Sequence, residues 1–160
     1  FIGSFDVNNA MSNPLKATKF GLPFRHVPTY LAGYYKYKAG DQFTEGGKPV
    51  NGKRDICDIY AIMYETSESV PTLDGTNAFT SPNLISTARI NNAKETNEWT
   101  YFKLPFTTLP GKFIDKEKLM DGKYNIAIVF TSSLEGDHFN GAIGSTLLID
   151  EAELIYHSED

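Results

Sequence analysis

The sequence predicts an all-β fold, a two-sheet antiparallel β-sandwich of the jelly-roll type, formed by residues 1–160 as a single domain. Three observations predict it. Apolar and polar residues alternate with period two over several short stretches, which is the spacing of a strand buried on one face. Turn-forming residues separate these stretches. Two further stretches, 55–65 and 124–132, are apolar on both faces, as strands in the centre of a sheet are.

Each remaining element is predicted from its own residues. In the strand 31–38, Tyr34, Lys36 and Lys38 share the solvent face. The polar residues 67–83 form a long loop, which is uncommon unless such a loop packs on the domain or contacts a ligand. A short helical turn is expected near 115–121, with Asp115 as its cap. Further strands are expected at 84–90, 100–106 and 147–156, the last of which closes the domain.

Composition and charge exclude several classes of protein. The chain has 160 residues, of which 41% are hydrophobic and 22% charged, as in an ordinary globular domain. Its net charge of −5 argues against a nucleic-acid partner, because phosphate binding requires a basic surface. Since no apolar run reaches about 18 residues, no transmembrane segment is expected in this chain. The single Cys57 allows no internal disulfide and is expected to be a buried, inert thiol.

The start of the chain suggests processing. It begins at Phe1 with a strand-like sequence and without an initiator Met. We expect a C-terminal domain of a longer exported precursor, which would carry an upstream domain of the same polypeptide. The expected location is extracytoplasmic: periplasmic, on the outer-membrane surface or secreted.

The carboxylates do not form a recognisable catalytic pair. Hydrolysis of a glycosidic bond needs two carboxyl groups about 5–10 Å apart across a cleft. Asp55 and Asp58 lie three positions apart in a predicted strand, so their side chains point to opposite faces. Glu135 and Asp137 lie in a loop, where acidic residues usually stabilise turns. The catalytic residues of a hydrolase therefore stay unassigned.

The aromatic residues favour a binding surface instead. The C–H faces of sugars stack on aromatic rings, while their hydroxyl groups bond polar side chains at the rim. By strand parity, Trp99, Tyr101 and Tyr34 face away from the main apolar stripe, and Arg89 faces outward from its own strand. A loop that could overhang a sheet edge contains three polar candidates. The predicted carbohydrate-binding residues are Trp99, Tyr101, Tyr34, Arg89, Asp137, His138 and Asn140.

Four stretches of the chain also carry a resemblance to a known family: 33–37 (GYYKY), 55–61 (DICDIYA), 98–102 (EWTYF) and, most specifically, 132–151 (SSLEGDHFNGAIGSTLLIDE). Together they resemble the putative carbohydrate metabolism domain, which occurs C-terminally in exported proteins of glycan-degrading gut bacteria. The resemblance implies a jelly-roll sandwich similar to carbohydrate-binding modules and to accessory domains of glycoside hydrolases. It also implies a poly- or oligosaccharide partner.

The closing strand is similar, more loosely, to the last strand of galactose-binding-like modules. In some of these modules a strand Asp and an N-terminal acidic residue hold a structural calcium, so the resemblance implies Asp150 and Asp6 as calcium ligands here. No other cofactor is expected. Parity places Asp150 on the same face as Leu148 and Leu154, which we take to be the core face, so its charge would need a partner.

The sequence thus leaves three functions open. The first is a module that resembles carbohydrate-binding modules and binds glycan through surface aromatics. The second is a structural or adhesive cell-surface module without glycan binding. The third is a glycoside hydrolase.

Overall fold

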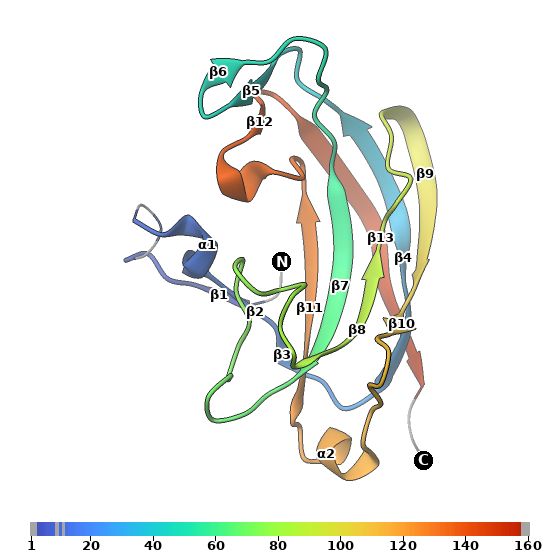
Figure 1. The fold of residues 1–160 in the computed structure, drawn as a ribbon. Coiled ribbons are helices and arrows are strands. Elements are labelled where there is room, and N and C mark those ends of the chain that lie inside the picture. The colour runs from blue at the N-terminus through green and yellow to red at the C-terminus, as the bar shows by residue number, and fades with distance from the viewer. Residues whose placement is uncertain (1–2, 9, 11, 158–160) are drawn as a thin grey trace.

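The computed structural model describes residues 3–8, 10 and 12–157. Two antiparallel sheets face each other and form a β-sandwich, as predicted, and a further layer of chain covers the outer side of one of them (Figure 1). The strand-like start that the sequence suggested at Phe1 and Ile2 lies outside the described residues.

The larger sheet has five strands in the order β10-β8-β7-β11-β3. Its central strands, β7 and β11, are the two that the sequence predicted to be buried on both faces. They pair without interruption, from Tyr124 opposite Glu65 to Thr131 opposite Asp58. The strands are β3 (Leu22–Pro23), β7 (Asp58–Glu65), β8 (Leu84–Arg89), β10 (Thr107–Thr108) and β11 (Tyr124–Thr131).

The second sheet has three long strands in the order β13-β4-β9. They are β4 (Val27–Lys38), β9 (Thr96–Pro105) and β13 (Thr146–His157). The strand β9 lies at the edge of this sheet, where Pro105, whose missing N–H cannot take part in a ladder, is tolerated. The main core fills the space between the two sheets, and Cys57 is buried in it, as predicted. Burial raises the pKa of the Cys57 thiol to about 11.

A second apolar cluster lies on the outer face of the five-stranded sheet. Two segments cover it, the polar stretch 66–83 and an N-terminal unit that consists of β1 (Gly3–Phe5), α1 (Pro14–Ala17) and β2 (Thr18–Phe20). Main-chain hydrogen bonds tie the two segments together, from Phe20 N to Leu73 O at 2.9 Å and from Gly75 N to Leu15 O at 2.7 Å. The predicted long loop therefore packs on the domain, as its length required.

Short elements complete the chain. The helix α2 (Lys116–Met120) confirms the predicted turn, because the Asp115 side chain accepts a hydrogen bond from Lys118 N at 2.9 Å. Neither α1 nor the 3-10 helix η1 (Gly136–His138) was predicted. Their three or four residues leave no helical period to detect.

None of the helices in the described residues has the length and apolarity needed to cross a membrane. A small sheet joins β5 (Phe43–Glu45), β6 (Lys48–Pro49) and β12 (Gly141–Ala142).

The predicted core face of the closing strand is wrong. In β13, Leu147 and Ile149 pack on the core, whereas Leu148 is 49% exposed and Asp150 is also exposed. The register shifts between Asp150 and Glu153, where Glu151 has a φ of 49°. This β-bulge adds one residue and exchanges the two faces. Parity counted through the bulge therefore misplaced the first half of the strand, and the Asp150 charge is in solvent.

Candidate functional site

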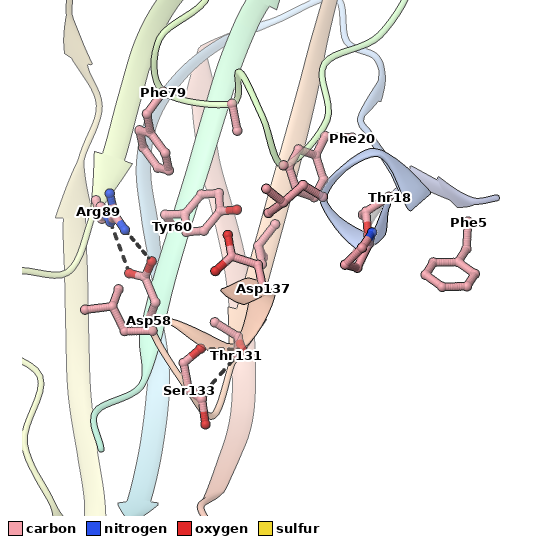
Figure 2. A pocket seen from close by; sticks show the side chains of 16 residues that line it. Phe5, Thr18, Phe20, Asp58, Tyr60, Phe79, Arg89, Thr131, Ser133 and Asp137 are labelled. Atoms are coloured by element: carbon pink, nitrogen blue, oxygen red, sulfur yellow. Dashed lines mark hydrogen bonds and ion pairs between the residues drawn. The ribbon is translucent and has the colours of Figure 1, made fainter. Parts of the chain in front are cut away.

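A pocket of about 440 Å³ opens on the outer face of the five-stranded sheet. Its floor comes from β7, β8 and β11, its walls from the N-terminal unit and the segment 66–83, and its roof from the loop 133–137 (Figure 2). The side chains that define its chemistry are Phe20, Asp58, Tyr60, Phe79, Arg89, Thr131, Ser133 and Asp137.

Aromatic rings form the apolar part of the pocket. Tyr60 projects from β7 and meets Phe79 edge-to-face, with ring centroids 4.8 Å apart. Tyr60 reaches this face because residues in a strand alternate sides, which sends Ile59 and Ala61 into the main core. Such rings offer flat surfaces on which the C–H face of a sugar can stack.

An ion pair stands at one end of the floor. Arg89 donates to both oxygens of Asp58, from Nη2 to Oδ2 at 2.7 Å and from Nε to Oδ1 at 3.2 Å (Figure 2). The Asp58 side chain is only 5% exposed, and the bidentate geometry compensates its loss of water. The guanidinium also lies over the Phe79 ring, 4.3 Å from its centroid. Arg89 is thereby fixed in place, and 42% of its side chain stays exposed.

Asp137 provides a carboxylate on the roof side, on the same side of the pocket as the Tyr60 hydroxyl (Figure 2). Burial, with smaller contributions from the charges of Asp58 and Asp137, raises the pKa of Tyr60 to about 12. The Tyr60 hydroxyl is therefore protonated at neutral pH and can donate a hydrogen bond. Three charged side chains line the pocket, and two of them, Asp58 and Arg89, neutralise each other.

The roof is held by the buried carboxylate of Asp55. Its Oδ2 accepts hydrogen bonds from Ser133 Oγ at 2.6 Å, Ser145 Oγ at 2.7 Å and Ala142 N at 2.9 Å. Asp55 is 3% exposed, so these bonds replace its water. A Cβ at Gly141 would lie 2.8 Å from Ser133 Oγ, and this position therefore requires glycine. Asp55 thus fixes both ends of the loop that carries Asp137.

The structure divides the predicted carbohydrate-binding residues between two sides of the sandwich. Arg89 and Asp137 line the pocket. Trp99, Tyr101 and Tyr34 lie on the outer face of the other sheet, where they are 44%, 54% and 36% exposed. Their predicted exposure is confirmed. The rings of Tyr34 and Tyr101 are 5.2 Å apart, and the Lys36 ammonium lies 4.8 Å from the Trp99 ring centroid.

The other predicted residues lie nearby or elsewhere. His138 is exposed at the end of η1, beside Asp137, and Asn140 accepts a hydrogen bond from Gly46 N at 3.2 Å, which ties two loops together. Asp6 follows β1, whereas Asp150 lies on β13 in a different sheet, so the two implied calcium ligands are not brought together. Within residues 3–8, 10 and 12–157, no cluster of three or more His, Cys, Asp or Glu side chains could hold a metal ion.

Sequence reasoning missed Asp58, Tyr60 and Phe79 as site residues. Asp58 was considered only as a partner of Asp55, and the predicted divergence of these two side chains is confirmed. The signal that could have identified Asp58 was its position as a charged residue at the start of an otherwise apolar strand, because such a charge needs a partner. Phe79 gave a weaker one, as an aromatic residue inside a polar loop that had to pack on something.

The fold and this pocket define a class: an all-β sandwich domain with a preformed, aromatic-lined ligand pocket on one sheet. Within that class the chain belongs to the family described as putative carbohydrate metabolism domain, whose sequence profile matches residues 1–155. The resemblance noted from the sequence is thereby confirmed, and the domain is related to carbohydrate metabolism. Among curated proteins, none matches the chain.

Two solved structures are similar to the chain over nearly its whole length. One is a putative glycoside hydrolase from Bacteroides thetaiotaomicron VPI-5482, with 89% identity and a TM-score of 0.98 over 99% of this chain and 46% of that one. The other is a putative glycoside hydrolase from Bacteroides vulgatus ATCC 8482, with 48% identity and a TM-score of 0.93 over 98% of this chain and 63% of that one. The chain thus spans less than two thirds of either solved protein.

Proposed function

We propose that this domain binds glycan, and that the pocket on the five-stranded sheet receives a sugar residue. The pocket itself carries the proposal: aromatic rings of Tyr60 and Phe79 stand beside the hydrogen-bonding groups of Arg89 and Asp137 in one preformed cavity. Sugars are recognised by this combination of ring faces and polar side chains. An extracytoplasmic location and a further domain in the same polypeptide belong to this proposal.

Binding is favoured over hydrolysis by the state of the carboxylates. Most glycoside hydrolases use two carboxyl groups on either side of the scissile bond. In this pocket Arg89 donates hydrogen bonds to both oxygens of Asp58. Asp137 is the other carboxylate in the lining, and no cation binds it in this bidentate way. A glycoside hydrolase stays the second candidate function because the two similar solved proteins are described as such.

The test is a glycan-array screen followed by calorimetry with the wild-type chain and with Phe79→Ala and Asp137→Ala. Both variants should weaken binding at least tenfold, about 1.4 kcal/mol. Phe79→Ala removes a stacking surface, and Asp137→Ala removes a hydrogen-bond acceptor. Asp41→Ala is the matched control, since Asp41 is exposed on a turn outside the pocket. A screen without a bound glycan would refute the proposal, and release of reducing ends from a bound glycan would favour the hydrolase.

A further inference from the structure

A second hollow, a groove of about 540 Å³, runs along the side of the sandwich between β8 and β9. The edge of β9 is free here, and the edge of β8 is free beyond Thr87, because Ile85 O already accepts a hydrogen bond from Leu109 N. In the described part of the chain, β8 pairs with β10 only through Thr87 and Ser86, and β9 pairs only with β4. Strand edges present unpaired N–H and C=O groups, which can bond the hydroxyl groups of a ligand. The polar and aromatic residues of the lining include Arg89, Asn91, Asn92, Lys94, Tyr101 and Lys103.

The charge of this groove is opposite to that of the whole protein. The chain carries a net charge of −5, yet every charged residue in the groove lining, Arg89, Lys94 and Lys103, is a cation. In the described residues, no carboxylate forms an ion pair with Lys94 or Lys103. The Lys103 ammonium lies over the Tyr30 ring, 4.4 Å from its centroid. Cations without carboxylate partners in a concave surface attract anions.

Arg89 connects the groove to the pocket, because it lines both. A chain whose end occupies the pocket can therefore continue past Arg89 along the groove toward the exposed ring of Tyr101. The two hollows differ in charge. In the pocket Arg89 is neutralised by Asp58 and Asp137 adds a negative charge, whereas in the groove Lys94 and Lys103 add two positive charges.

We infer that the ligand is an acidic oligosaccharide, with an uncharged terminal sugar in the pocket and units that bear sulfate or carboxylate groups in the groove. This inference rests on the proposed function, and it adds the class of glycan. Sulfate esters and uronate carboxylates offer the same chemistry to lysine, namely charge-assisted hydrogen bonds. An extended peptide could also pair with the free strand edges. The glycan is favoured because the groove shares Arg89 with a pocket that carries sugar-binding chemistry and lies in a domain related to carbohydrate metabolism.

The experiment compares matched oligosaccharides of several backbones in three forms: sulfated, uronate-bearing without sulfate, and neutral after desulfation and carboxyl reduction. We expect one or both acidic forms to bind the wild-type chain at least tenfold more tightly than the neutral form. The preference should shrink as salt is raised from 50 to 300 mM. Comparison of the two acidic forms identifies the anionic group.

Substitutions test whether the two lysines of the groove cause the preference for acidic forms. Lys94→Gln with Lys103→Gln should abolish the preference for the acidic form, because the two groove cations outside the pocket are removed; both side chains are exposed, so the fold should tolerate the change. Lys48→Gln, an exposed lysine on β6, is the matched control and should change nothing. Thermal midpoints verify that each variant is folded.

Two outcomes would overturn this inference and leave the proposed function standing. The first is equal affinity for neutral and acidic forms, with binding still lost in Asp137→Ala. The second is a preference for acidic forms that survives in the double variant. If no form of any backbone binds, the proposed function fails as well. Capture of extended peptides that is lost in the double variant, without glycan binding, would assign the groove to a peptide strand instead.

Discussion

The molecule has two aromatic surfaces, which lie on opposite faces of the sandwich and differ in enclosure. In the pocket, the Arg89 guanidinium covers Phe79 at 4.3 Å, and on the open strip of Tyr34, Tyr101 and Trp99 the Lys36 ammonium covers Trp99 at 4.8 Å. The side-chain types are alike. The pocket, however, is surrounded by three separate parts of the chain, whereas the strip belongs to one sheet without a covering layer (Figure 1).

Enclosure is therefore what separates a site from an exposed surface here. A ligand in the pocket exchanges water for contacts on several sides, and its hydrogen bonds strengthen as water is excluded. A ligand on the strip keeps one side in water.

The largest effect is expected from Asp55→Ala. The change leaves Ser133 and Ser145 hydroxyls and the Ala142 N–H without their acceptor. Each unsatisfied buried group costs about 1–3 kcal/mol, so the free energy of unfolding should fall on the order of 3 kcal/mol, or roughly 10 °C in Tm. Glycan binding should disappear with the roof of the pocket. Urea unfolding and calorimetry measure the two effects, and Asp41→Ala should show neither.

The second-largest effect is expected from alkaline pH, which should lower the free energy of unfolding through Tyr60 in the pocket. Burial raises the pKa of Tyr60 to about 12 from 10, so the folded state holds this proton more tightly than the unfolded state. The resulting stability is complete below pH 10 and is lost as pH rises to 12, roughly 2 kcal/mol from this group. Urea unfolding at pH 9 and 11.5 measures the loss, and Tyr60→Phe should reduce it. An equal loss in the variant would show that Tyr60 is not responsible.

Arg89→Gln should lower the free energy of unfolding by about 1–2 kcal/mol, because it leaves the Asp58 carboxylate buried without its cation. The exposure of Arg89 keeps this loss below that of a fully buried ion pair. Arg54→Gln is the matched control. Arg54 binds Glu95 in the same bidentate way, but both groups are exposed and solvent screens their charges. The free energy of unfolding of the Arg54→Gln variant should therefore hardly change. Chemical denaturation of both variants measures the difference. Equal losses would contradict the importance of burial at Asp58.

The smallest effect is expected on the open strip. Trp99→Ala should change the free energy of unfolding by less than about 1 kcal/mol, because Trp99 is 44% exposed and lies outside the cores. Binding of short oligosaccharides should also stay the same. If Trp99→Ala abolishes glycan retention while the fold stays stable, the strip is the site and the proposed ranking of the two surfaces is wrong.

Local sequence patterns were enough for the framework. Period-two alternation placed β4 and β9, continuous apolar runs placed β7 and β11, and Asp115 marked α2. Parity also placed Tyr34 and Trp99 on an exposed face, since exposure depends only on the strand itself. It failed at the bulge of β13, where one additional residue exchanges the faces.

The pocket could not be predicted in the same way. Tyr60 and Phe79 meet only because the segment 66–83 folds back over β7, and Phe20 joins them from the N-terminal unit. These contacts depend on tertiary packing between segments that are far apart in sequence, which no local period reports. Arg89 and Asp137 were selected for outward parity and loop position, and their convergence on one cavity became visible only in the fold.

The hydrogen bonds of Asp55 have a consequence for the order of folding. They join residues 78, 87 and 90 positions apart in the chain, so each of them closes a long loop. The entropy of closing such loops must be lost before the contacts can compensate for it, and contacts of this kind form late. We therefore expect the β7–β8 pair, whose partners lie between 20 positions (Tyr64 and Leu84) and 29 positions (Tyr60 and Arg89) apart, to form before the roof of the pocket docks. A chain that is still folding would have this part of the pocket floor before it has the roof.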